Sequence, residues 1–197
     1  MRSMTLLPCV GLFAVIAVTA LPAVAATHHT CPAAVPSSAS STWDFKGEAN
    51  TLFGEIQSAA GDALFHADQL QTFAADDHIS WLSHASQWTL IRDDINEIGA
   101  KLCRLEAIRS AVLPWQRLEI DRIETIARPM ASNAQAAIVF ADSNQRLLWV
   151  PSYRQEVTEV YNGAKSLTGS VDKAVEFASV SKEYRDLAIA EGVIWPF

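Results

Sequence analysis

Two histidines occupy positions at which their side chains could act together. His66 and His84 both fall on the apolar stripes of neighbouring predicted helices, on either side of a polar turn centred near Asp76. If these helices pack antiparallel, the two imidazoles face each other at one height, and the same counting brings Asp142 and Tyr153 to that end of the bundle. Two imidazoles and a carboxylate suit zinc or copper, and two facing imidazoles suit a b-type haem. The alternative is a buried polar layer that only fixes the helix register.

His28 and His29 form a second candidate metal site, which depends on where an exported chain is cut. Cleavage after Ala25 leaves His28 in third position, and cleavage after Ala26 leaves His29 there. The imidazole, the free amine and two backbone nitrogens then make a square-planar set that suits Cu(II) or Ni(II). A third-position histidine also arises by chance.

Residues 1–26 predict a secretory signal peptide. Arg2 precedes an apolar run that ends in small residues of the Ala-x-Ala type. We therefore expect a periplasmic or extracellular protein without a stable membrane span after cleavage; the rival interpretation is an uncleaved anchor. Cys31 and Cys103 remain in the mature chain, and two cysteines in an exported protein favour a disulfide over a metal pair.

The sequence lacks the signatures of common catalytic sites. It contains no Gly-rich phosphate loop, no Gly-x-Ser-x-Gly, no His-Glu-x-x-His, no Cys-x-x-Cys-His and none of the Glu-x-x-His pairs of di-iron bundles. The formal net charge is −7, and no basic stripe is present, which argues against a nucleic-acid partner. Whether the protein is an enzyme stays open, but the pattern favours binding over catalysis.

Apolar residues at alternating steps of three and four predict four long helices. The strongest pattern covers residues 80–112. The other three cover 45–73, 114–149 with a kink at Pro129, and 153–190 with a break near Ser179–Ser181. Short connections make consecutive helices antiparallel, so we predict an all-α, up-down-up-down four-helix bundle with coiled-coil-like packing.

The expected domain plan is a signal peptide over 1–26, an extended or disordered lead over 27–43 and the helical domain over 44–197. Thr42 or Asp44 is expected to cap the first helix. The apolar residues 193–197 should pack back on the bundle.

Three glycines in the first predicted helix follow one line. Gly47, Gly54 and Gly61 are seven residues apart, and their line lies about 170° from the centre of the apolar stripe. A helical glycine costs roughly 1 kcal/mol relative to alanine. The line could therefore mark a groove that a partner helix approaches closely; harmless surface glycines are the alternative.

The segments HADQL (66–70), LCRLEAIRS (102–110) and LPWQ (113–116) resemble an uncharacterised family of exported acidobacterial helical proteins. The resemblance covers most of the mature chain and implies export and a helical fold, but no activity. We expect a binding or structural interaction module that acts on a protein partner or as a homo-oligomer. The alternative function is a metal-ion or b-type haem protein that uses His66 and His84.

Overall fold

The computed structural model describes Cys31 and residues 43–190. The predicted signal peptide, most of the lead and the apolar segment 193–197 lie outside this part. Four long helices make up the described chain: α1 (Phe45–Ala74), α2 (Trp81–Ile108), α3 (Pro114–Ser143) and α4 (Pro151–Ala190). A short 3-10 helix, η1 (Arg109–Ala111), joins α2 to α3, and residues 43–190 contain no strand. The predicted all-α four-helix bundle is confirmed.

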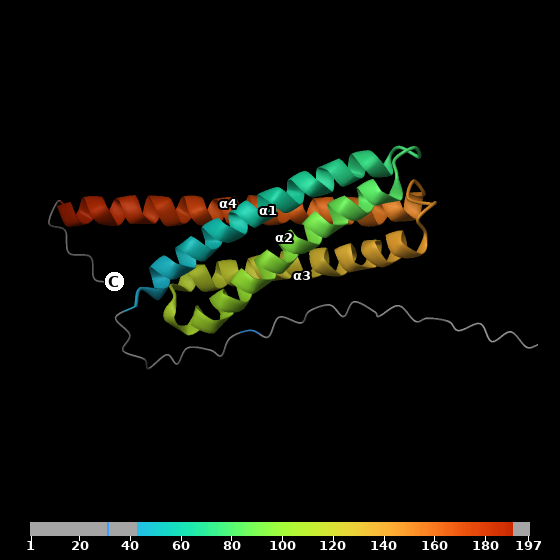
Figure 1. Cartoon of the computed structure of the whole chain (residues 1–197). Helices are drawn as coiled ribbons and strands as arrows, with labels where there is room; N and C mark the ends of the chain where they lie inside the picture. The colour runs from blue at the N-terminus through green and yellow to red at the C-terminus, as the bar shows by residue number, and fades with distance from the viewer. Residues whose placement is uncertain (1–30, 32–42, 191–197) are drawn as a thin grey trace, which may run out of the picture.

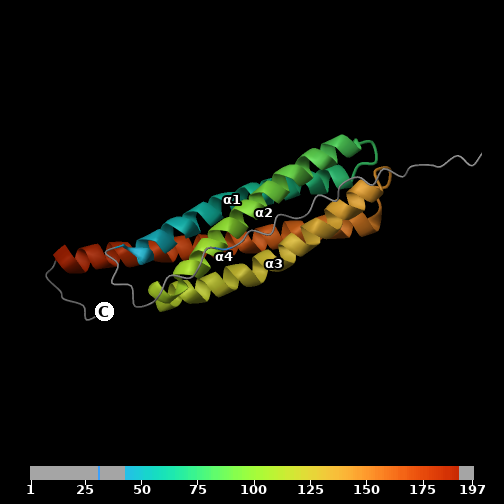
Figure 2. The same ribbon diagram turned by 60° about the horizontal axis from the view of Figure 1, so that its bottom comes forward.

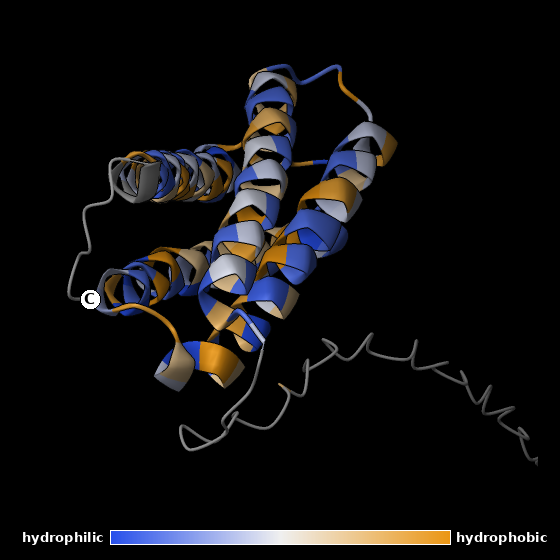
Figure 3. Cartoon of the chain, turned by 90° about the vertical axis from the view of Figure 1, so that its left-hand side faces the viewer, coloured by the Kyte–Doolittle hydropathy of each residue, from blue (hydrophilic) through white to orange (hydrophobic). Residues whose placement is uncertain are grey.

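The four helices form a ring in which consecutive helices are antiparallel neighbours. α1 packs on α2 and α4, and α3 packs on the same two helices. Figures 1 and 2 show the short connections, and in both views the end of α4 projects beyond the other three helices. Figure 3 shows polar and apolar residues alternating around each helix, as expected when one face is buried.

The core is one continuous apolar cluster with contributions from every helix. Alanines are frequent on the buried face of α1, where they let α2 and α4 approach closely. The larger, fully buried members come from all four helices: Phe53, Ile56, Leu70, Ile91, Ile98, Leu105, Ile108, Ile120, Ile123, Met130, Tyr153 and Leu167.

Side chains cap the first two helices, and a proline opens the third. The Asp44 carboxylate accepts a hydrogen bond of 3.0 Å from the Gly47 amide, which confirms one of the two predicted caps of α1. Ser80 caps α2 in the same way. Pro114 occupies the first turn of α3, where its missing N–H costs nothing. These local signals mark where the first three helices begin.

Two predicted helix boundaries are wrong. α3 ends at Ser143 rather than near residue 149. The side-chain amide of Asn144 donates to the Phe140 carbonyl over 2.9 Å and takes the place of the helical hydrogen bond from the Asn144 backbone N–H. α4 runs unbroken through Ser179–Ser181 to Ala190. Among the side chains that the structure describes, its buried stripe ends at Ala178, just before these serines, so the helix continues past them without burial in its own bundle.

Candidate functional site

His66 and His84 do not share a site. His66 Nδ1 lies 2.9 Å from an Asp94 carboxylate oxygen on α2. The His84 ring instead meets the ring of Phe73, with centroids 6.0 Å apart. Phe73 lies seven residues beyond His66 on α1, which is about 10 Å along the helix axis. The predicted facing pair, and with it the bis-imidazole site for metal or haem, is therefore not assembled.

The two histidines lie apart because the register of α1 against α2 differs from the predicted one. Asp94 opposite His66 and Phe73 opposite His84 place the symmetry point of the α1–α2 pair between residues 78 and 80, not at Asp76. Asp94 itself is partly buried, and this burial raises its pKa although the His66 contact opposes the rise. His66 and Asp94 thus form a polar contact that joins α1 to α2.

His84 belongs to a buried hydrogen-bonded group with Trp88 and Tyr153. The indole N–H of Trp88 donates to the Tyr153 hydroxyl over 2.9 Å, and His84 Nδ1 lies 3.0 Å from the same oxygen. Because an indole nitrogen can only donate, the hydroxyl accepts from Trp88 and donates its own proton to His84. His84 then carries its proton on Nε2. The expectation that His84 has a polar partner from helix three or four is confirmed by Tyr153 of α4.

Burial keeps this group uncharged. It lowers the pKa of His84, and it raises the pKa of Tyr153 far above its ordinary value. The ring of Phe140 stacks on Tyr153 with a centroid distance of 5.7 Å, and Phe73 covers His84 from α1. All four helices therefore contribute to one neutral layer, the polar layer. It matches the alternative interpretation of His84 as a residue that fixes helix register.

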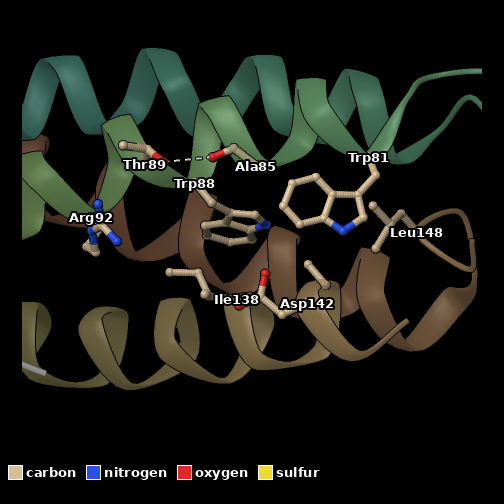
Figure 4. Close-up of a pocket in the computed structure, with 9 residues that line it drawn as sticks. Trp81, Ala85, Trp88, Thr89, Arg92, Ile138, Asp142 and Leu148 are labelled. Carbon is tan, nitrogen blue, oxygen red and sulfur yellow. Dashed lines mark hydrogen bonds between the residues drawn. The ribbon is translucent and has the colours of Figure 1, made fainter. Parts of the chain in front are cut away.

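A cavity of about 140 Å³ lies beside the polar layer, between α2 and α3. Figure 4 shows the indole rings of Trp81 and Trp88 along one side and Ile138, Asp142 and Leu148 opposite. Ala85, Thr89, Arg92 and Ala141 complete the lining. The seven-residue spacing of the two tryptophans is the signal in the sequence that could have pointed to this cavity.

The polar groups of the cavity differ in how well they are satisfied. Trp88 uses its N–H on Tyr153, and the Thr89 hydroxyl donates to the Ala85 carbonyl over 2.9 Å. The Trp81 N–H is shielded from solvent and has no hydrogen-bond acceptor among the described residues. Asp142 and Arg92 have exposed side chains that bring opposite charges to the lining. The cavity thus offers one unsatisfied donor beside two aromatic faces.

Cys31 and Cys103 form the predicted disulfide, with Cα atoms 4.9 Å apart. The bond attaches the chain ahead of α1 to the last third of α2. The predicted metal-binding residues His28 and His29 lie outside the described residues, so that site stays a prediction.

The glycine line on α1 is partly covered by α4. Gln57, beside the line, donates to Asp172 of α4 over 2.8 Å. A Cβ atom at Gly54 or Gly61 would meet no neighbouring atom within 4 Å, so no other described segment approaches α1 closely at these two positions. Gly47 differs, because its Cβ would collide with the capping carboxylate of Asp44. Whether a partner uses this face stays open.

Two acidic clusters among the described residues could hold a cation by distance alone. One is the exposed turn Asp76–His78. The other joins Glu106, Asp121 and Glu124, but Arg109 and Arg128 already neutralise these carboxylates. Neither cluster includes His66 or His84.

The projecting end of α4 carries a second apolar stripe, called here the α4 stripe. Its residues follow steps of three, four and three, and they are 51% to 66% exposed: Phe177, Val180, Tyr184 and Leu187. Phe177 at its base packs edge-on against Trp115 of α3, with centroids 4.9 Å apart. The stripe is therefore continuous with the aromatic surface of the bundle.

No family model, curated protein or solved structure matches the chain. Within the described residues, no helix has the length and apolar character needed to cross a membrane.

Proposed function

We propose that the protein is exported and acts by binding, as a structural or interaction module of the periplasm or cell exterior, with a second copy of itself on the α4 stripe. The observation that carries this proposal is the α4 stripe. Four large apolar side chains at helical spacing are costly to leave more than half exposed, because complete burial of such a side chain is worth about 1.5–3 kcal/mol and these four realise only part of it. Phe177 lies where the stripe leaves the bundle, and the other three residues follow Ala178, the last buried residue among those described in α4, toward the end of the helix that projects beyond the other three (Figure 1).

A second copy fits the stripe because the spacing is self-complementary. Steps of three and four mesh with the same steps on another helix, as in coiled coils. In an antiparallel pair, Phe177 meets Leu187 of the second copy and Val180 meets Tyr184. A two-fold axis repeats both contacts. None of the four side chains is charged, so the seam buries no unpaired ion.

The disulfide supports export, and the net charge bears on the type of partner. The disulfide between Cys31 and Cys103 is the type of bond that persists in oxidising compartments. The formal net charge of −7 suits a protein whose partners are neither nucleic acid nor anionic membrane surfaces. The disulfide agrees with the signal peptide expected over residues 1–26.

Light scattering on purified mature protein tests the proposal. We expect a mass of two chains at micromolar concentration, and Leu187→Glu should reduce it to one chain because a charge enters the seam. Leu82→Glu is the matched control: Leu82 is 75% exposed at the start of α2, whereas Leu187 is 56% exposed on the stripe. A wild-type monomer, or equal masses for both variants, would contradict self-association.

A further inference from the structure

The cavity between α2 and α3 has the size and walls of a site for one flat ring. Its volume of about 140 Å³ is close to that of an engineered protein cavity of about 150 Å³ that binds benzene. Two indole rings, Ile138 and Leu148 supply apolar contacts, and the small residues Ala85 and Ala141 leave the space open (Figure 4). A single six-membered ring would fill this volume.

One wall of the cavity is held in place before any ligand arrives. Trp88 is fixed through its N–H on Tyr153, and Tyr153 is fixed in turn by His84 and by the stacked ring of Phe140. Trp88 can therefore offer a ligand only its ring face. A wall that needs no reordering lowers the entropic cost of binding.

The polar groups around the cavity suit a ligand that can both accept and donate a hydrogen bond. The Trp81 N–H is buried without an acceptor, a state that costs free energy until an acceptor arrives. Across the cavity, Asp142 presents carboxylate oxygens that only accept (Figure 4). A hydroxyl group meets both needs, because its oxygen accepts from the indole and its proton goes to the carboxylate.

We propose that this cavity binds a small neutral phenol, with its ring against Trp81 and Trp88 and its hydroxyl between the Trp81 N–H and Asp142. Charged relatives fit less well, since Asp142 repels a benzoate ion and Arg92 repels a benzylammonium ion. A ring without a polar group leaves the Trp81 N–H unsatisfied. The site is separate from the α4 stripe and does not depend on self-association.

Indole N–H signals in a ¹H–¹⁵N correlation spectrum of the mature protein give a direct test. The Trp81 signal is identified by its loss in Trp81→Phe. Phenol added to wild type should shift this signal saturably in the millimolar range. Toluene, which has the same ring without the hydroxyl, should bind roughly thirtyfold more weakly, because two hydrogen bonds of about 1 kcal/mol each are lost. Trp81→Phe should weaken phenol binding, followed on the Trp88 signal, by roughly fivefold, the effect of one of these bonds.

Two substitutions show whether the phenol occupies this cavity. Ala85→Leu should abolish binding by filling the space, whereas Ala100→Leu, on an exposed position of the same helix, should leave binding unchanged. Asp142→Ala, at an exposed position, should weaken phenol but not toluene, and it serves if Ala85→Leu fails to fold. The absence of a saturable shift, equal affinities for phenol and toluene, or phenol binding unaffected by Asp142→Ala would each overturn the proposal.

Discussion

At Tyr153, one hydroxyl satisfies two neighbouring buried groups, accepting from Trp88 and donating to His84. This arrangement requires a neutral His84, because a protonated imidazole has no lone pair to accept the tyrosine proton. Burial also favours the neutral imidazole, because it lowers the pKa of His84. The charge state of one histidine is thereby connected to the packing of a layer in which four helices meet.

This connection predicts that acid destabilises the protein through His84. The unfolded chain protonates His84 near its ordinary pKa of 6.5, whereas the folded chain resists protonation until a lower pH. The His84 contribution to stability is therefore complete above pH 6.5 and is lost as the pH falls from there to the depressed folded pKa. The slope in that window should reach about 1.4 kcal/mol per pH unit.

Urea unfolding at a series of pH values measures this slope. His84→Gln should flatten it, whatever the variant's stability at neutral pH. His78→Gln is the control, since His78 lies in the exposed turn between α1 and α2. Equal slopes for wild type and His84→Gln would refute the link between acid and the polar layer.

At the scale of the helices, periodicity predicts which face of each helix is buried but not how far one helix slides along another. An apolar stripe with a near-seven-residue repeat presents nearly the same face after a shift of two turns. The fold and the cap at Asp44 could therefore be read from the sequence, while the height of His66 could not. For the cavity, the spacing of Trp81 and Trp88 marks one wall in the sequence, but the opposite wall comes from α3, whose register against α2 the pattern does not determine.

Two glycines of α4, Gly163 and Gly169, should respond in opposite ways to replacement by alanine. A Cβ atom at Gly163 would lie 2.9 Å from the Cβ and Cγ atoms of Met130 on α3, so Gly163 marks a close approach of these helices. Gly169 has open space around it. Gly163→Ala should lower the free energy of unfolding by about 1–3 kcal/mol through overpacking. Gly169→Ala should raise it by up to about 1 kcal/mol through helix propensity.

Thermal unfolding of the two alanine variants provides the comparison. Each serves as the other's control, because the two substitutions are chemically identical and lie on one helix. Shifts of the melting temperature in the same direction would show that the α3–α4 interface accommodates the methyl group.

At the scale of the whole molecule, the two ends of the bundle differ. The polar layer and the cavity lie near the α1–α2 and α3–α4 connections. The other end has the start of α1, the disulfide and the projecting part of α4. There a hydrogen-bond cluster ties α3 to α1: the buried Gln116 amide donates to the Lys46 carbonyl over 2.9 Å and to Asn50 over 2.8 Å. This cluster therefore fixes the start of α3 against the start of α1.

The disulfide provides the prediction at this scale. Cys31 and Cys103 are separated by 72 residues, so their bond restricts a long loop of the unfolded chain. In the chain-entropy model a loop of this size contributes about 4 kcal/mol to stability. Reduction should therefore lower the urea midpoint strongly, and the Cys31→Ser, Cys103→Ser double variant should match the reduced wild type. The double variant should not respond to reductant.

Reduction of the disulfide should lower the stability of the protein without changing its assembly. The α4 stripe contains no cysteine and lies on another helix, so under conditions where the reduced protein remains folded, its mass by light scattering should equal that of the oxidised protein. A drop to one chain on reduction alone would mean that the segment held by Cys31 takes part in the contact between copies. An unchanged urea midpoint would instead mean that ordering this segment in the folded state cancels the entropy gained from the closed loop.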